Sequence, residues 1–275
     1  MTQPESGSAK TIDEVLEQLD RVIAHTIAEP SRLSFFASLY RGVTAQVKAG
    51  IAAGRFEDGP RMERLDVTFA NRYLAALEQF QRGEPPSQCW RVAFEAVAHR
   101  RPIILQHLLL GMNAHINFDL AIAAAQTSPG SQLPSLKRDF DAINDILAAM
   151  VPKIMREMSV LSPWIGLLNH IDPKAEIALI NFSIVKARAY AWEMAEELAP
   201  LHSDQWAPVL EAADTTISVL GDLIANPVGI VFKMGLRVIR LREINDIPRT
   251  ARLLSRATAA DVVWPARLDG KQSEE

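Results

Sequence analysis

The stretch from residue 102 to residue 125 reads PIILQHLLLGMNAHINFDLAIAAA, and it is apolar on nearly every side of a helix. A helix that is hydrophobic all round is normally buried at the centre of a protein. Its polar residues are informative, because burying a polar group is costly unless the group is paired. We predict that this segment is the central buried helix of the fold.

Two histidines and an aspartate stand out on this helix. At about 100° per residue, His115 and Asp119 lie about 80° and 120° around the axis from His107. Residues four apart on a helix are neighbours, so His115 and Asp119 should touch, with His107 two turns away on their flank. Imidazole and carboxylate together suit iron, manganese or zinc, and helical bundles build metal sites from such inward side chains. The pattern predicts His107, His115 and Asp119 as ligands of a divalent metal (Fe, Zn or Mn). The alternative is a structural His–carboxylate hydrogen bond in the core.

The remaining polar residues of the central helix share another face. On the same count Gln106, Asn113 and Asn117 fall within about 240–280°. We interpret these amide side chains as hydrogen-bonding partners of neighbouring helices. Asn113 and Asn117 are also candidates for substrate binding. Arg188 and Trp192, on a later helix, are further candidates for substrate binding, because they could face the same cavity as the polar residues of the central helix.

A site on one helix needs partners from others. Asp66 and Asp139 each occupy a position on an otherwise apolar stripe, where a carboxylate is unexpected. We predict that Asp66 and Asp139 complete the site or act as a base, and that Arg72 pairs with the buried acids. The alternative is that Asp66 caps its helix or pairs with an arginine. Asp141 and Asp145 share a different face of their helix and are expected to be solvated.

The rest of the chain has helical periodicity almost throughout and lacks good β-hairpin signals. We predict an all-α, single-domain multi-helix bundle over residues 11–262, with a disordered N-terminus (1–10) and a polar C-terminal tail (263–275). Helices are expected at 11–28, 33–53, 60–82, 89–98, 102–127, 136–158, 174–198, 202–224, 227–243 and 247–260.

Composition limits the possible functions. The formal net charge of −4 argues against nucleic-acid binding, which needs a basic surface. The N-terminus has no apolar stretch typical of a secretory signal, so we expect a soluble, cytoplasmic protein. Residues 229–242 form a basic amphipathic pattern that could lie on an anionic membrane. We interpret the segment instead as a helix that packs against the core and whose Lys and Arg side chains extend their charged ends into water. The oligomeric state is open.

Several strings in the chain resemble an uncharacterised bacterial family, domain of unknown function 5995. They are RFED (55–58), RMERLD (61–66), FANRYL (69–74), QHLLLGMNAHINFDL (106–120) and RDFDAIN (138–144). The resemblance runs from about residue 12 to 255. The family's recurrent signature includes residues also reached by helix geometry: Asp66, Arg72, His107, Asn113, His115, Asp119 and Asp139. The resemblance supports this choice of site and implies no reaction.

Two classes of function follow. The first is a metal-dependent enzyme, hydrolase-like, acting on a small or lipid-like substrate in a buried helical pocket. The second is a metal-free protein whose helical pocket binds an apolar ligand, or an isoprenoid-type cyclase in which Asp139, Asp141 and Asp145 would matter more than the histidines. In either case we expect the buried polar cluster to be a functional site. The negative charge of the buried carboxylates could be compensated by a metal ion or, alternatively, by Arg72 or Arg138.

Overall fold

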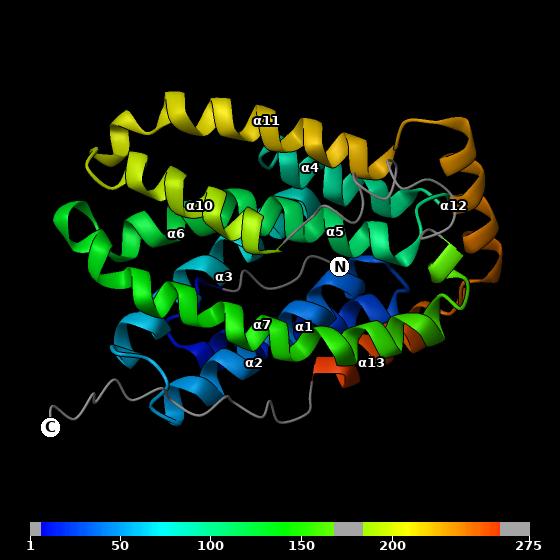
Figure 1. Cartoon of the computed structure of the whole chain (residues 1–275), viewed down its shortest axis with the longest axis horizontal. Coiled ribbons are helices and arrows are strands. Elements are labelled where there is room, and N and C mark those ends of the chain that lie inside the picture. Colours follow the sequence, from blue (N-terminus) through cyan, green and yellow to red (C-terminus); the bar gives the residue numbers. More distant parts are fainter. Residues whose placement is uncertain (1–6, 168–183, 259–275) are drawn as a thin grey trace, which may run out of the picture.

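Helices make up nearly all of the regular structure (Figure 1). The computed structural model describes residues 7–167 and 184–258, and no strand occurs among them, so the predicted all-α class is confirmed. The helices are α1 (Ile12–Ala28), α2 (Leu33–Ala52), α3 (Gly59–Gln81), α4 (Gln88–Glu95), α5 (Ile104–Ala114), α6 (Leu120–Thr127), α7 (Leu133–Leu161), α10 (Ile184–Leu198), α11 (Ala207–Ala225), α12 (Ile230–Arg242) and α13 (Ile247–Thr258).

The predicted central helix is present, and it contains a π-helical turn. The turn (His115–Asp119) joins α5 to α6, so that one continuous helical rod runs through the middle of the fold (Figure 1). By length and composition Ile104–Thr127 could cross a membrane, but 89% of its apolar window is buried inside the protein. It packs against α2, α3, α4, α10 and α11. The apolar sequence therefore reflects a position in the core.

The start of the central rod is fixed by an acid from far along the chain. The Glu243 carboxylate accepts hydrogen bonds from the Ile104 backbone N–H at 3.0 Å and from the Ser162 hydroxyl at 2.9 Å. The Gln106 side chain accepts from the Ile103 N–H and donates to the carbonyl of Ile224 in α11. These bonds satisfy backbone groups that a helix end leaves open, and they set the position of the rod against α11 and α12.

Helix α2 approaches the rod very closely at a glycine. A Cβ atom added to Gly111 would lie 2.5 Å from the ring of Phe36 in α2. The missing side chain lets the Phe36 ring rest against the rod. Phe36 then packs edge-on against His115, with ring centroids 5.7 Å apart. The close approach brings the aromatic face of α2 to the π-helical turn.

The ends of the helices follow the local sequence signals. Thr11 caps α1, because its hydroxyl accepts from the Glu14 N–H at 3.2 Å. The helix expected at 174–198 is described only from Ile184, and the predicted tail at 263–275 lies outside the described residues. At the other end Ala9 exchanges two hydrogen bonds with the side chain of Asn71, both at 2.9 Å, so the ordered contacts begin within the stretch expected to be disordered.

Candidate functional site

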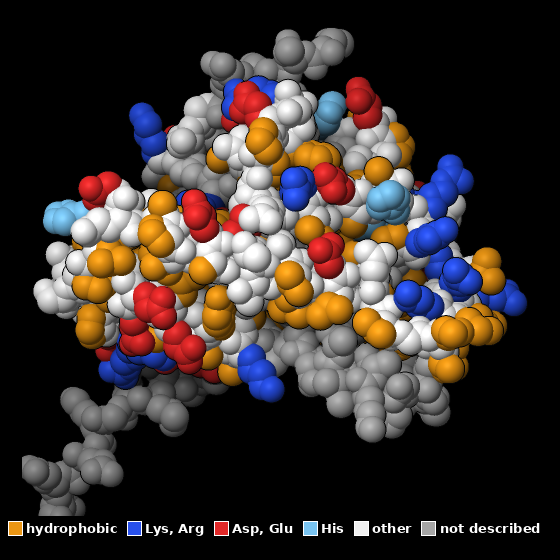
Figure 2. Space-filling view, turned by 90° about the horizontal axis from the view of Figure 1, so that it is seen from above, with side chains coloured by type: hydrophobic (Ala, Val, Ile, Leu, Met, Phe, Trp, Pro, Cys, Tyr) orange, Lys and Arg blue, Asp and Glu red, His pale blue; other side chains and the backbone are white. Residues whose placement is uncertain are grey.

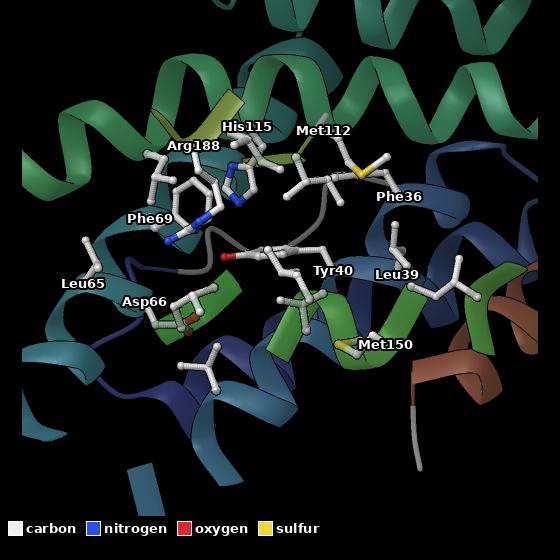
Figure 3. A pocket seen from close by; sticks show the side chains of 18 of the residues that line it. Phe36, Leu39, Tyr40, Leu65, Asp66, Phe69, Met112, His115, Met150 and Arg188 are labelled. Atoms are coloured by element: carbon white, nitrogen blue, oxygen red, sulfur yellow. The ribbon is translucent and has the colours of Figure 1, made fainter. Parts of the chain in front are cut away.

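A largely apolar cavity of about 110 Å³ lies beside the π-helical turn (Figure 3). Its walls come from α2, α3, the central rod, α7 and the start of α10. Most of the lining is aliphatic or aromatic. The polar exceptions are Tyr40, Asp66, His115 and Arg188. In the view of Figure 3 these polar side chains gather toward one end of the cavity, whereas Leu39, Met112 and Met150 lie toward the other. The cavity therefore has a polar end and an apolar end.

Asp119 lies behind this wall and is fully engaged by protein groups. Its Oδ1 accepts from Arg72 Nε at 2.9 Å, and its Oδ2 accepts from Trp90 Nε1 at 2.8 Å. His115 Nδ1 lies 3.2 Å from Oδ2, so the predicted contact between His115 and Asp119 is present. The Arg72 guanidinium compensates the carboxylate charge, which is the role expected of Arg72 if no metal is bound. Asp119 does not line the cavity.

His115 presents a free nitrogen to the cavity. A carboxylate can only accept a hydrogen bond, so the short contact to Asp119 assigns the proton of the neutral ring to Nδ1. Nε2 is then an acceptor, and it is buried with no hydrogen-bond partner among the described residues. Burial lowers the pKa of His115, although Asp119 opposes that shift. The ring stacks on Phe69 with centroids 3.5 Å apart, which holds its orientation.

Asp66 lies on the same cavity wall and keeps its proton at neutral pH. Burial, reinforced by the nearby charge of Glu63, raises the pKa of Asp66 to about 8. Its Oδ2 has no hydrogen-bond partner within the described part of the chain. The predicted alternatives for Asp66, a helix cap or an arginine pair, are not what this geometry shows: Asp58 caps α3, by accepting from the Arg61 N–H at 2.9 Å.

Arg188 supplies the positive charge of the cavity. Burial lowers the pKa of Arg188 to about 10, so the guanidinium stays charged at neutral pH. Its Nη2 donates to the Phe140 carbonyl, and its Cζ lies 4.3 Å from the centroid of the Phe140 ring. Its Nε is buried without a hydrogen-bond partner, and no described carboxylate forms a salt bridge with it. Asp141 acts on Arg188 only through its charge. This is the residue through which the cavity can recognise an anion.

His107 is not brought together with His115 and Asp119. It packs against Phe35, with ring centroids 5.9 Å apart, and borders two small hollows beside Arg32 that are separate from the main cavity. Burial, together with Arg32 and Arg240, lowers the pKa of His107 to about 3, so the ring is neutral. Within residues 7–167 and 184–258 no group of three or more His, Cys, Asp or Glu side chains is arranged to hold a metal ion.

Asp139 has a structural partner set and does not line the cavity. Its carboxylate accepts from the backbone N–H groups of Glu57 and Asp58, at 2.6 and 3.1 Å, and from Arg61 Nη2 at 2.8 Å. These bonds tie α7 to the loop before α3. The structure does not bring Asp139 to the cavity, because the loop amides, which no periodicity reveals, occupy its oxygens. Arg138 pairs with the exposed Glu57, away from the buried acids.

The two asparagines and Trp192 also lie away from the cavity. Asn113 donates to the Ile217 carbonyl of α11 at 2.9 Å, and Asn117 donates to the Asn113 side chain at 3.0 Å. Asn113 therefore makes the predicted interhelical bond, whereas the bond of Asn117 lies within the central rod. Trp192 stacks edge-on against Phe140 at 5.0 Å and donates to Glu196, so of the two candidates on α10 only Arg188 reaches the cavity.

Two features of the site are not predicted by the helical pattern of the sequence. One is the π-helical turn, which periodicity at 3.6 residues per turn does not reveal; such turns are frequent at functional sites. The other is the aromatic wall formed by Phe36, Tyr40 and Phe69. The signal that could have found it is the spacing of Phe36 and Tyr40, four residues apart on one face of α2.

Comparison with known proteins places the chain by sequence. No curated protein and no solved structure matches it. A family model described as "Family of unknown function (DUF5995)" matches residues 12–227, well over half of the chain. That span includes the whole central rod and every described residue that lines the cavity. The chain therefore belongs to the DUF5995 family of unknown function.

Proposed function

We propose that this protein binds a small apolar molecule with a carboxylate end in the cavity beside the π-helical turn, without a metal. The observation that carries the proposal is Arg188, a buried guanidinium with no carboxylate partner among the described residues. A buried charge is costly unless it is paired. A ligand carboxylate would pair it, and the aliphatic end of the cavity would take the ligand's chain.

The other polar groups are compatible with an anionic ligand. Asp66 is mostly protonated at neutral pH, so it would donate a hydrogen bond to a carboxylate and would not repel it. His115 is neutral and would add no competing charge. Among the described residues that line the cavity, Arg188 is then the only charged side chain. The electrostatics favour one negative charge on the ligand.

The cavity volume limits the ligand size. A water-sized group needs about 10–15 Å³ on this scale, so 110 Å³ holds about seven to eleven non-hydrogen atoms. Octanoate has about ten non-hydrogen atoms, which lies within that range. A medium-chain fatty acid or a compact branched acid is therefore the ligand class we propose.

This proposal replaces the metal-dependent reading of the same residues. Both oxygens of Asp119 already accept hydrogen bonds from Arg72, Trp90 and His115. His107 lies outside the cavity, and Arg72 balances the carboxylate charge. The cyclase reading loses support in the same way, because none of Asp139, Asp141 and Asp145 lines the cavity.

Titration calorimetry with octanoate tests the proposal. We expect saturable binding to the wild-type protein, weakened about 10- to 100-fold in Arg188→Met. That factor corresponds to the about 1.5–3 kcal/mol of a hydrogen bond to a charged group. Octanol, which has the chain but no charge, should bind weakly and equally to both proteins.

Arg138→Met is the matched control, because Arg138 is an exposed arginine that pairs with Glu57 outside the cavity. It should bind octanoate like the wild type. Equal affinity of the wild type for octanoate and octanol would contradict the proposal, as would an Arg188→Met variant with unchanged octanoate binding.

A second candidate function is favoured by one observation, the free Nε2 of His115 on an imidazole that Asp119 orients. This arrangement is that of a general base. Nε2 would take a proton from water as the water oxygen bonds to the carbonyl carbon of an ester. The carbon–oxygen bond to the alcohol would then break, and the departing alkoxide would take that proton from Nε2. The site would thus hydrolyse an ester of the same acid.

Hydrolysis of ethyl hexanoate, an ester of about ten non-hydrogen atoms that the cavity can hold, distinguishes the two candidates. A catalytic His115 predicts that His115→Gln lowers the rate by about 100-fold or more, the usual contribution of general-base catalysis. His107→Gln, which changes a buried histidine outside the cavity, should leave the rate unchanged. A wild-type rate no faster than buffer excludes the hydrolase and leaves the binding function.

A further inference from the structure

We propose that the outer face of α12 binds the surface of an anionic lipid membrane. This face carries the exposed apolar side chains Ile230, Val231, Met234 and Leu241, which are 79, 63, 58 and 81% exposed. Val228, in the turn before α12, is 77% exposed and extends the same apolar surface. Large side chains this exposed, and this close together, mark an interaction site.

The cations of α12 flank this apolar stripe. With Ile230 at zero and about 100° per residue, Leu241 and Met234 lie at about 20° and 40°, and Val231 at about 100°. On the same count Lys233 and Arg237 lie at about 300° and 340°, and Arg242 lies at about 120°. The buried side chains Phe232, Leu236 and Ile239 are on the opposite side, at about 180–240°. The helix is therefore anchored by one face and presents a second apolar stripe, bordered by positive charge, to the outside.

The charges on this surface are available for a partner. Helix α12 contains Lys233, Arg237, Arg240 and Arg242 and no acidic residue. Arg240 is used internally, since it donates to the Arg100 carbonyl and pairs with Glu243. Neither Lys233 nor Arg237 forms a salt bridge with a described residue, as Arg240 does with Glu243. Lys233 and Arg237 are exposed.

Trp164 completes the edge of the surface. It is 44% exposed, and Arg242 Cζ lies 5.0 Å from the centroid of its ring. Tryptophan is enriched where proteins meet the headgroup region of a membrane. Figure 2 shows hydrophobic and basic side chains gathered at the right-hand end of the molecule, the end at which α12 lies in Figure 1. The combination of apolar residues, flanking cations and an aromatic edge is that of an interfacial membrane-binding helix.

A membrane suits this surface better than a second copy of the chain does. Two copies related by a two-fold axis through α12 would bring Lys233 and Arg237 of each close to the same cations of the other, and like charges across an interface are repulsive. Anionic headgroups would neutralise them. By length and composition α11 and α12 together could form a broken membrane span, bent by 68°. The buried face of α12 favours docking on the surface, because Phe232, Leu236 and Ile239 are already packed against the protein.

Vesicle flotation of the full chain tests this inference, and it is independent of ligand binding in the cavity. At low salt we expect binding to vesicles of phosphatidylcholine with about one-third phosphatidylserine, and little binding to pure phosphatidylcholine. Lys233→Gln with Arg237→Gln should weaken binding by about 25-fold, about fivefold for each cation. Ile230→Ser with Leu241→Ser should weaken it by at least as much, and both side chains are exposed enough to leave the fold intact.

The matched control is Arg64→Gln with Arg91→Gln, which removes two exposed cations from α3 and α4 and changes the net charge equally. It should bind the vesicles like the wild type. Failure of the wild type to float with the anionic vesicles overturns the proposal, and so does equal weakening by the control pair. Light scattering that finds a dimer dissociated by Leu241→Ser would assign the surface to self-association instead.

Discussion

Replacing Asp119 with alanine is expected to destabilise the protein by about 3–5 kcal/mol, the usual effect of removing one partner of a buried ion pair. Asp119 is 1% exposed and accepts hydrogen bonds from Arg72, Trp90 and His115. Without it the Arg72 guanidinium loses its counter-charge and the Trp90 N–H loses its acceptor. For a chain of this size we expect the Tm to fall by about 6–15 °C.

Thermal and urea melts of wild type and variant measure this effect. The control is Asp141→Ala, which removes an exposed carboxylate paired with Lys137, and which should cost at most about 1 kcal/mol. Chelator should not reproduce the Asp119→Ala loss in the wild type. If chelator does so, Asp119 is a ligand of a metal site. If Asp119→Ala melts like the wild type, the bonds from Arg72 and Trp90 do not stabilise the fold.

The second large effect is a gain. Asp66→Asn is expected to stabilise the protein by about 2–4 kcal/mol at pH 7. The pKa of Asp66 is about 8 in the folded protein, against 3.8 for an ordinary aspartate. In this pH range the folded chain holds a proton that the unfolded chain releases, so stability falls as pH rises from about 4 to 8. The full difference is at most about 6 kcal/mol, of which burying the asparagine amide offsets a part.

Urea unfolding at several pH values tests this prediction. The gain in Asp66→Asn over the wild type should reach its maximum above about pH 8. Below about pH 4, where both folded and unfolded carboxyls are protonated, it should disappear or become the small loss caused by the buried amide. Asp145→Asn, which changes an exposed aspartate of α7, is the control, and its stability should follow that of the wild type at every pH. Glu243, whose pKa is raised to about 7 by burial, adds a slope of the same sign to both proteins, so only the difference between them is decisive. A gain independent of pH would show that the pKa of Asp66 is not raised by burial.

The one-dimensional pattern of the chain was sufficient to determine its class and its centre. An apolar stretch of 24 residues has no polar face to turn to water, so it must be buried, and the helices around it follow from their own apolar stripes. The contact between His115 and Asp119 also followed from sequence alone, because residues four apart meet on a helix whatever surrounds it. Local geometry carries all of these conclusions.

Contacts between distant segments were decided only by the tertiary structure. The helical pattern made three residues equally plausible members of the site. In the structure His107 lies beside Arg32, Asp139 binds the loop before α3, and Asp66 faces the cavity. Which partner a buried polar group finds depends on how helices approach one another, and that in turn depends on details such as the missing side chain at Gly111. Helical periodicity specifies the face a residue occupies, whereas its partner comes from a helix whose position is set by packing of the whole core.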